Sequence, residues 1–572
     1  MDEPHDTLSD PERPWLQHYA PGVPADIPDV DHTLVDVLDR SCRAHRERTA
    51  LEFFGRVMSY GALEQQVAQA AEGLRRLGVS AGDRVAIILP NSPQNVVAFY
   101  AVLRLGAIAV QHNPLYTAPE LRHQFEDHGA RVVVAWTKVV DTVLGFADAV
   151  GIEAIIAADI VDAMPLGKRI ALRLPIAKAR QARSALGASV PRHPLVHDWR
   201  RLHVHGRLDA AHPRPSVDDT ALIQYTSGTT GAAKGAVLSH ANLVANTMQG
   251  RAWLPGLREG DEVFYGVLPL FHAYGLTLNL TFAISVGARL VLFPTPDVGL
   301  IVSAARRTPP SFIPAVPPLY ERIAAAAEKG DIDVSGVRYA ISGAMSLPVS
   351  TVERWEAVSG GYLVEGYGMT ETSPVALGNP VGPTRRPGTV GVPFPSTRIR
   401  LIDPEHPDRE LAPGERGELL ISGPQVFQGY WGNDEATAAA LLPERWLRTG
   451  DIAEVSDDGF VRIVDRLKEL VITGGFNVAP SEVEQALREH PDVLDAAVVG
   501  LPRTSGGEDV AASIVLRVGR NSTVEAVREF VRTRLTPYKV PRRIDIVLEL
   551  PRNLVGKVLR REVRQRMLDR DS

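Results

Sequence analysis

Residues 225–235 bring together the residue types that suit a polyphosphate. The segment reads Tyr-Thr-Ser-Gly-Thr-Thr-Gly-Ala-Ala-Lys-Gly, and apolar runs at 220–225 and 236–238 predict a strand on either side. Glycines expose backbone N–H groups, hydroxyls add donors, and the ammonium of Lys234 adds a positive charge. The segment lacks the Gly-Lys-Ser/Thr of a Walker A loop. Taken alone, it is also compatible with a glycine-rich hairpin turn.

Further motifs follow this loop along the chain. They are Ser342-Gly-Ala-Met345, Glu365-Gly-Tyr-Gly-Met-Thr-Glu371, Thr449-Gly-Asp451, Asp465-Arg-Leu-Lys-Glu-Leu470 and Pro551-Arg-Asn-Leu-Val-Gly-Lys557. In this order the motifs resemble the signatures of adenylate-forming enzymes, the superfamily of acyl-CoA synthetases, luciferases and peptide-synthetase adenylation domains. The resemblance runs from about Thr33 to Arg561, and its closest similarity is to bacterial long-chain fatty-acid CoA ligases.

The resemblance implies a site for ATP and Mg²⁺. It assigns the β- and γ-phosphates to Thr226, Ser227, Gly228, Thr229, Thr230, Gly231 and Lys234. Glu371 is the expected Mg²⁺ ligand, with Thr229 beside it, because a hard cation on phosphate oxygens prefers oxygen ligands. Thr370 is expected to contact the α-phosphate.

The resemblance also places the nucleoside. The adenine ring would occupy a slot formed by Gly343, Ala344 and the backbone of Glu365, Gly366 and Tyr367. Asp451 would accept hydrogen bonds from the ribose hydroxyls, and Arg466 would reach the same ribose or the phosphate.

Two lysines near the C-terminus are expected to serve different steps of the reaction. Lys557 would meet the substrate carboxylate and the α-phosphate during adenylation, since a flexible ammonium neutralises both. Lys468 occupies the family's hinge position, about which a small domain rotates before thioester formation. Gly474 and Gly475 would then let the backbone lie close to the pantetheine arm of coenzyme A.

The acyl substrate is expected to bind near residues 268–275, which resemble the acyl-pocket segment of acyl-CoA synthetases. His272 would lie where acyl chain, adenylate and thiol meet, and it is counted among the catalytic residues. The mainly apolar run 276–286 favours a medium- or long-chain fatty acid. An aryl acid such as a cinnamate, transfer of the adenylate to a carrier protein, a luciferase-like oxygenase and a non-catalytic sensor are the alternatives.

The elements that position these residues alternate between helical and strand patterns. A helix is expected at 63–77, strands at 84–89, 132–135 and 290–293, and a helix at 480–490 with Ser481 as its N-cap. This pattern predicts an α/β fold. The resemblance adds a large domain of two α/β subdomains and a distorted β-barrel, followed by a small mobile α+β domain. We expect an extended arm at 1–30, the large domain at 31–466 and the small domain at 467–572.

Composition describes an ordinary globular chain of 572 residues with a net charge of −6, which argues against nucleic-acid binding. The single cysteine, Cys42, excludes an intramolecular disulfide and lies in a predicted helix. The polar, acidic N-terminus does not resemble a secretory signal, so a cytoplasmic enzyme is expected. The longest apolar stretch, 96–110, is too short to span a bilayer and is predicted to be a buried helix leading into a strand.

The stretch between Asp162 and Asp198 contains no acidic residue. It carries seven basic ones: Lys168, Arg169, Arg173, Lys178, Arg180, Arg183 and Arg192. Aliphatic residues alternate with these charges, a pattern typical of peripheral contact with anionic lipid at 168–183. A solvated insertion between strands is the simpler alternative. For the oligomeric state, a homodimer is an alternative to a monomer.

Overall fold

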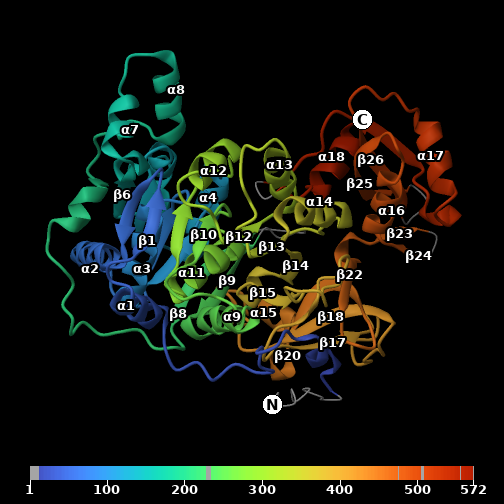
Figure 1. Ribbon diagram of the computed structural model, residues 1–572, viewed down its shortest axis with the longest axis horizontal. Coiled ribbons are helices and arrows are strands. Elements are labelled where there is room, and N and C mark those ends of the chain that lie inside the picture. The colour runs from blue at the N-terminus through green and yellow to red at the C-terminus, as the bar shows by residue number, and fades with distance from the viewer. Residues whose placement is uncertain (1–11, 227–232, 474–475, 504–507, 554–555, 571–572) are drawn as a thin grey trace. The chain divides into compact units, whose positions relative to one another are not determined.

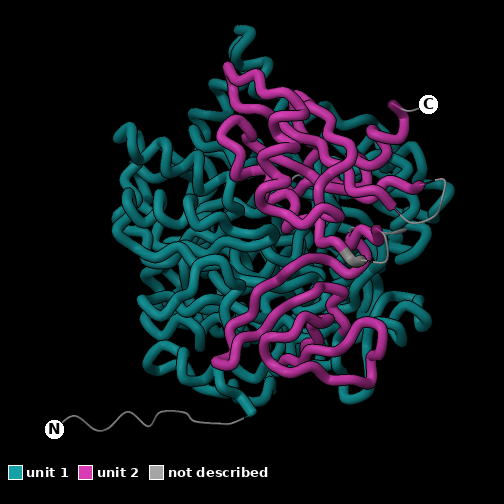
Figure 2. The backbone as a smooth tube through the Cα atoms, turned by 90° about the vertical axis from the view of Figure 1, so that its right-hand side faces the viewer, with its two compact units in different colours: residues 1–398, 422–447 teal, residues 399–421, 448–572 magenta. Residues whose placement is uncertain are grey.

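The computed structural model of the protein describes residues 12–226, 233–473, 476–503, 508–553 and 556–570. The chain divides into two compact units, coloured separately in Figure 2. Unit 1 comprises residues 1–398 and 422–447, and unit 2 comprises residues 399–421 and 448–572. The mixed α/β architecture confirms the predicted fold class. The expected domain boundary between residues 466 and 467 falls inside unit 2.

One eight-stranded sheet of unit 1 carries the glycine-rich loop. Its order is β19 (Gly429–Tyr430), β9 (Lys234–Ser239), β8 (Thr220–Thr226), β4 (Ile108–Gln111), β3 (Arg84–Ile88), β5 (Val132–Trp136), β6 (Ala154–Ala158) and β7 (Val196–Asp198). Strands β8 to β7 in this order are parallel, whereas β9 and β19 are antiparallel additions. The strands predicted at 84–89, 132–135, 220–225 and 236–238 are therefore confirmed, with small shifts at their ends.

A nine-stranded sheet forms the other half of unit 1. Its order is β16 (Val392–Pro393), β15 (Val375–Gly378), β14 (Leu363–Gly368), β13 (Tyr339–Ser342), β12 (Phe312–Ala315), β10 (Val263–Gly266), β11 (Arg289–Leu292), β1 (Thr49–Phe53) and β2 (Arg56–Ser59). The central strands β14 to β1 are parallel, so β12, β13 and β14 end at the same edge of the sheet. That edge carries two of the predicted nucleotide motifs.

Helices cover both sheets (Figure 1). They are α1 (Leu34–Ala44), α2 (Tyr60–Arg76), α3 (Pro93–Arg104), α4 (Ala118–His128), α5 (Val140–Leu144), α6 (Ala147–Val150), α7 (Leu166–Ala171), α8 (Ala177–Leu186), α9 (His240–Trp253), α10 (Ala273–Gly275), α11 (Phe282–Ser285), α12 (Val298–Ala305), α13 (Pro317–Glu328), α14 (Val349–Ser359) and α15 (Asp434–Ala440). A π-helix joins α10 to α11 at Leu276–Thr281. Among the described residues no helix is long and apolar enough to cross a bilayer.

Helix α3 explains the longest apolar stretch of the sequence. Every residue of the helix from Pro93 to Leu103 is buried, and α3 contacts β3 and β4 of one sheet and β1 of the other. A helix that is apolar all round must be buried on every face, and a position between two sheets provides that burial. The chain then enters β4, as the sequence predicted. The neighbouring α1 buries Cys42, whose pKa rises to about 12 through loss of solvation.

Residues 12–30, which we expected to be extended, include a short 3₁₀-helix at Pro14–His18. Trp15 and Leu16 are buried, and the hydroxyl of Tyr19 donates to the carbonyl of Pro393 at 2.7 Å. Apolar side chains thus fix this segment to unit 1, a contact that a count of Pro and Asp residues does not reveal.

Unit 2 contains most of a five-stranded sheet and a small α/β part. The five-stranded sheet contains β17 (Arg398–Ile402), β18 (Arg416–Ser422), β21 (Trp446–Val455), β20 (Leu441–Leu442) and β22 (Val461–Arg466). A hairpin of β23 (Val471–Thr473) and β24 (Phe476–Val478) follows, then the three-stranded sheet β25 (Val493–Pro502), β26 (Glu508–Leu516) and β27 (Arg543–Val547). Helices α16 (Pro480–Arg488), α17 (Val524–Arg532) and α18 (Arg560–Asp569) pack on that sheet, where Val483, Leu487, Val527 and Val531 join its core.

The expected N-cap of α16 is wrong by two residues. The cap position belongs to Ala479, and Ser481 lies in the first turn of the helix. Its hydroxyl donates to the carbonyl of Val464, and its N–H donates to Asp465 at 2.7 Å. Ser481 therefore joins α16 to strand β22, a tertiary contact that took precedence over local capping.

Candidate active site

The glycine-rich loop joins the adjacent ends of β8 and β9. Thr226 and Lys234 are partners in the antiparallel register, so the two residues mark the base of the loop. Ser227, Gly228, Thr229, Thr230 and Gly231 lie outside the described residues. Below the loop, the hydroxyl of Tyr225 donates to Asp127 at 2.5 Å and anchors the end of β8 to helix α4. The expected strand–loop–strand context of a phosphate site is therefore present.

Lys234 and Glu371, which lie far apart in the sequence, meet through Tyr430. The ammonium of Lys234 lies 4.9 Å from the centre of the Tyr430 ring, and the Tyr430 hydroxyl donates to Oε1 of Glu371 at 2.7 Å. Glu371 is buried in the 3₁₀-turn Thr370–Thr372. Burial, followed by the charge of Glu371, raises the pKa of Tyr430, so this phenol stays a donor. One cation, one phenol and one carboxylate thus form a compact polar group.

The Ser-Gly-Ala-Met motif turns out of β13 at the edge of the nine-stranded sheet. Ala344 has a left-handed φ of 68°. A Cβ on Gly343 would lie 3.0 Å from the ring of Tyr274, whose hydroxyl donates to Ile341. A side chain at position 343 would therefore fit only if the Tyr274 ring moved by a few tenths of an ångström. In contrast, a Cβ on Gly366 would find no atom closer than 3.6 Å, so its glycine is not required by the protein alone.

Strand β14 presents the second nucleotide motif at the same edge. The side chain of Glu365 is buried, and loss of solvation raises its pKa to about 8, although the N–H of Leu347 donates to it. Tyr367 and Thr370 are partly buried. Gly368 was not singled out from the sequence, yet a Cβ there would lie 1.8 Å from the carbonyl oxygen of Pro374. Close packing of this turn therefore fixes the orientation of residues 367–371.

The segment around His272 is held by buried amides. Asn91 and Asn279 both donate to the carbonyl of Leu268, and Gln224 on β8 donates to the carbonyl of Phe271. Burial lowers the pKa of His272 to about 4, so its imidazole is neutral at pH 7. A neutral imidazole suits contact with an apolar chain better than an imidazolium does. The following residues 276–281 form the buried π-helix, a form often found at functional sites.

Unit 2 brings three of the predicted residues together. Asp451 and Arg466 are register partners on β21 and β22, and Nε of Arg466 lies 3.2 Å from Oδ1 of Asp451. Asp451 is buried, whereas Arg466 is partly exposed. The N–H of Asp451 donates to Thr449, whose hydroxyl donates to Leu419, so the turn before Asp451 is fixed. This pair offers a carboxylate and a guanidinium to a polyhydroxylated or anionic ligand.

Lys557 interacts electrostatically with Asp451 and Arg466. Burial, followed by the nearby charge of Arg466, lowers the pKa of Lys557 to about 8, although Glu469 and Asp451 oppose the shift. The turn itself is closed by Asn553, whose N–H donates to the Lys557 carbonyl and whose side chain accepts from the Lys557 N–H, each at 2.9 Å. A partly buried ammonium close to neutrality suits a role in charge neutralisation or proton transfer.

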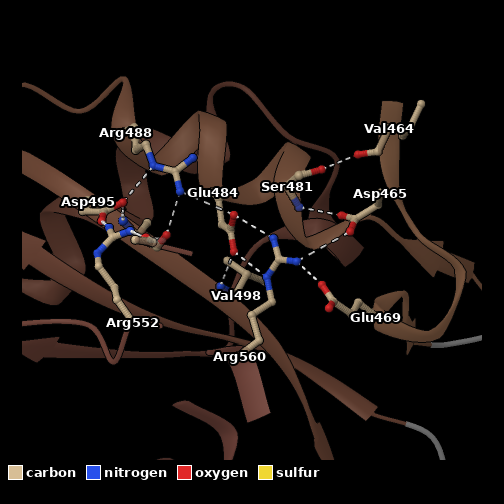
Figure 3. Close-up of polar contacts among 12 residues, drawn as sticks. Val464, Asp465, Glu469, Ser481, Glu484, Arg488, Asp495, Val498, Arg552 and Arg560 are labelled. Atoms are coloured by element: carbon tan, nitrogen blue, oxygen red, sulfur yellow. Dashed lines mark hydrogen bonds and ion pairs between the residues drawn. The ribbon is translucent and has the colours of Figure 1, made fainter. Parts of the chain in front are cut away.

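Arg560, three residues further on, is the centre of an ion-pair network (Figure 3). Its guanidinium binds Glu484 with two parallel bonds of 2.9 Å and also donates to Glu469. Glu484 in addition accepts from the N–H of Val498 at 2.9 Å. Burial opposes the charge of Arg560, but Glu484 and Glu469 outweigh it and raise its pKa. The network joins α18, α16 and the 3₁₀-turn Leu467–Glu469.

The hinge candidate Lys468 belongs to that turn, between Arg466 and Glu469. Its side chain is exposed. Gly474 and Gly475 lie outside the described residues, but the neighbouring Thr473 is buried and accepts from Arg503 at 2.8 Å. Both flanks of Lys468 are thus fixed to unit 2, since Asp465 accepts from the N–H of Ser481 and Glu469 accepts from Arg560.

A Mg²⁺ ion would need the phosphate oxygens of a bound nucleotide in addition to the side chains of this protein. Within the described ranges, no group of three or more His, Cys, Asp or Glu side chains could hold a metal. Mg²⁺ is commonly bound by one or two carboxylates together with substrate phosphates. Glu371, as a single buried carboxylate that Tyr430 links to Lys234, matches that kind of site.

Two contributors were missed in the sequence. Neither Tyr430 nor Arg560 belongs to the nucleotide or lysine motifs identified in the sequence. The sequence does not reveal either role, because both depend on contacts between residues far apart along the chain. Tyr430 contacts Glu371, and Arg560 contacts Glu484. An available signal was the position of Arg560 on the helix that directly follows Lys557.

The chain belongs to the AMP-binding enzyme family. That family matches residues 38–431, and the family's C-terminal domain matches residues 482–557. The predicted adenylate-forming superfamily is thereby confirmed.

Among its relatives, the long-chain-fatty-acid–CoA ligase of Bacillus subtilis (strain 168) is 35% identical, with 96% of this chain and 98% of the relative covered. A feruloyl-CoA synthase of Amycolatopsis sp is 33% identical over 92% of this chain and 97% of the relative. The crystal structure of ATP-bound MatB from Rhodopseudomonas palustris has a TM-score of 0.78 and 28% identity, with 94% and 100% of the two chains covered.

Proposed function

We propose that this protein joins a medium- or long-chain fatty acid to coenzyme A at the expense of ATP. The acid first attacks the α-phosphorus of ATP and forms an acyl-adenylate as pyrophosphate leaves. The thiol of coenzyme A then attacks the acyl carbon, and AMP leaves. The observation that carries the proposal is the cluster of Asp451, Arg466 and Lys557 in unit 2, which combines a buried carboxylate with two cations.

For the first step we assign the nucleotide to the motifs of unit 1 and to the Asp451–Arg466 pair. Lys234 and the loop residues Thr226 to Gly231 would hold the β- and γ-phosphates, and Glu371 with Thr229 would hold Mg²⁺. Thr370 would contact the α-phosphate. When bound, Mg²⁺ would neutralise phosphate charge. Asp451 would accept from the ribose hydroxyls. The turn at Gly343–Ala344 and residues 365–367 of β14 would accommodate adenine.

Lys557 is proposed to neutralise the carboxylate and the α-phosphate as they approach each other. No protein nucleophile is needed for this step, so positioning and electrostatics supply the catalysis. The partly buried position of Lys557 supports this role, because a charge in a dry site acts more strongly than one in water.

For the second step we propose a rotation at Lys468 that removes Lys557 and brings the segment at Gly474–Gly475 to the pantetheine arm. Such a hinge needs one residue that can change its backbone angles between two fixed flanks. The contacts of Asp465 with Ser481 and of Glu469 with Arg560 provide fixed flanks on the two sides of Lys468.

A fatty acid is favoured over an aryl acid by the segment after His272. Leu276, Leu278 and Leu280 lie in the buried π-helix, which carries no cationic side chain for a second carboxylate. The similarity to long-chain-fatty-acid–CoA ligases supports the same choice. The similarity to a feruloyl-CoA synthase keeps the aryl acid as the second candidate. Chain length is weakly selected in an apolar site, since each methylene contributes only about 0.8 kcal/mol.

The test is AMP release with ATP, Mg²⁺ and coenzyme A across acids from acetate through palmitate and oleate to coumarate. The Glu371→Gln variant serves as the inactive control. A maximum at long chains agrees with the proposal, and a maximum at coumarate replaces the fatty acid by an aryl acid. Acyl-adenylate that forms without transfer to free coenzyme A indicates a carrier protein as acceptor. No AMP release with any acid contradicts the proposed reaction.

As partners we propose ATP, the fatty acid and coenzyme A. A cytoplasmic location and a homodimer remain predictions. Size-exclusion chromatography with light scattering separates a dimer from a monomer.

A further inference from the structure

The connection between β6 and β7 contains a helical projection that the fold does not need. The two strands are parallel neighbours, yet residues 159–195 separate them. A parallel crossover needs only about a dozen residues. Helices α7 and α8 occupy much of the connection, and Figure 1 shows them extending beyond the strands of their own sheet. We call residues 166–183 the basic lobe.

Aliphatic side chains on the basic lobe face solvent. The exposed fractions of Leu166, Ile170, Leu174 and Ile176 are 69%, 57%, 48% and 53%. Helix α7 buries no residue, and α8 buries only Ala179. Single exposed aliphatics are normal on a protein surface, but a contiguous group of them marks a binding surface. The lobe thus contributes little to a core and offers apolar side chains to another phase or molecule.

Cationic side chains alternate with these aliphatics. Lys168 and Arg169 attach the lobe to the body of unit 1, since Lys168 donates to the carbonyl of Phe54 at 3.0 Å and Arg169 lies 2.9 Å from Asp162. In contrast, the exposed side chains of Arg173, Lys178 and Arg180 form no ion pair with any described residue. The net charge of the whole chain is −6, so this local excess of positive charge is not a general property of the surface.

We propose that the basic lobe docks on an anionic lipid bilayer. Leu174 and Ile176, together with Leu166 and Ile170, would enter the boundary between headgroups and acyl chains, while Arg173, Lys178 and Arg180 would contact lipid phosphates. Cations interleaved with aliphatic side chains match this interface better than an acidic protein, which would leave the aliphatics in water. The proposal rests on the proposed function for its purpose, because a long-chain acid is concentrated in membranes, but lipid binding itself needs no substrate.

The test is co-sedimentation of the full chain with sucrose-loaded vesicles, without ATP, acid or coenzyme A. Vesicles of phosphatidylcholine mixed with phosphatidylglycerol are compared with phosphatidylcholine alone, at low and high salt. We expect binding to the anionic vesicles that falls at high salt. Each of two variants, Leu174→Ser/Ile176→Ser and Arg173→Gln/Lys178→Gln/Arg180→Gln, is expected to lower the partition coefficient about tenfold or more.

The matched control is Val518→Ser/Leu548→Ser, which removes two of the most exposed aliphatics of unit 2. It should bind vesicles as the unaltered chain does. Thermal unfolding of every variant confirms that the folds are retained. The proposal is overturned if the unaltered chain stays in the supernatant, if both lobe variants bind normally, or if the control loses as much binding as they do. Because no substrate is present, a failure of the proposed ligase activity leaves these outcomes unaffected.

Discussion

The hydroxyl of Tyr430 donates a 2.7 Å hydrogen bond to Oε1 of Glu371, and the face of the same tyrosine ring lies 4.9 Å from the ammonium of Lys234. One side chain therefore orients the proposed Mg²⁺ ligand and contacts the proposed phosphate-binding cation. Tyr430 can do both because the edge strand β19 pairs with β9, the strand that begins at Lys234.

Tyr430→Phe should raise the Mg²⁺ concentration that adenylation requires. The substitution removes the hydroxyl but keeps the ring near Lys234. A hydrogen bond to a charged group contributes about 1.5–3 kcal/mol, which corresponds to roughly tenfold or more in the Mg²⁺ concentration required. The measurement is ATP–pyrophosphate exchange against Mg²⁺ concentration. Tyr362→Phe, at an exposed position of unit 1, is the control. An unchanged Mg²⁺ requirement would mean that the phenol does not orient the metal ligand. A lower requirement would mean that the phenol competes with the metal.

Lys557→Ala should separate the two half-reactions. Adenylation is expected to fall by about 10²-fold or more, because the charge at the reacting centre is lost. Transfer of a chemically prepared acyl-adenylate to coenzyme A should persist. Single-turnover measurements of both steps provide the comparison. Equal losses in the two steps would contradict the assignment of Lys557 to adenylation alone.

The pH dependence of adenylation should report the titration of Lys557. Its pKa of about 8 in the folded protein means that the required ammonium is present below pH 8 and is lost above it. The rate at low substrate should therefore fall about tenfold per pH unit above that value. Lys557→Arg should be slower but flat between pH 8 and 10, since a guanidinium stays charged. The control Lys539→Arg should keep the original profile, and the same alkaline decline in Lys557→Arg would assign the titration to another group.

Arg560→Met should destabilise unit 2. The substitution leaves Glu484, whose side chain is 8% exposed, without its bidentate partner. Breaking a buried pair costs about 3–5 kcal/mol, and we expect the lower part of that range because Arg560 retains some exposure. Urea denaturation measures the loss. Arg566→Met on the same helix removes only an exposed i,i+4 pair and should change stability by less than about 0.5 kcal/mol. Similar effects of the two substitutions would show that the network does not stabilise α18.

Lys468→Pro should spare pyrophosphate exchange and block thioester formation, because a fixed φ prevents the proposed rotation. Lys468→Ala removes the same exposed side chain but leaves the backbone free, so both half-reactions should survive in it. If Lys468→Pro retains thioester formation, the pivot lies at another residue.

The sequence predicted most of the regular elements and the order of the nucleotide motifs. Short apolar runs at 84–89 and 132–135 identified parallel strands because strands buried on both faces are apolar throughout. Ser481 was assigned incorrectly because its side-chain contact with Val464 is made across the fold. Tyr430 and Arg560 escaped notice for the same reason, since their partners Glu371 and Glu484 lie 59 and 76 positions away along the chain.

The path of the chain through its units has a consequence for biosynthesis. Residues 422–447 return to unit 1 after an excursion into unit 2, and within this return Gly429 and Tyr430 pair with Val237 and Ala236 of β9. A nascent chain released from the ribosome only as far as residue 398 therefore lacks both the edge strand and the phenol that contacts Glu371. Unit 1 is complete only when residue 447 has emerged, about fifty residues later, by which time β17 and β18 have already been synthesised. Vectorial folding of this protein is thus expected to proceed with the two units growing together instead of one after the other.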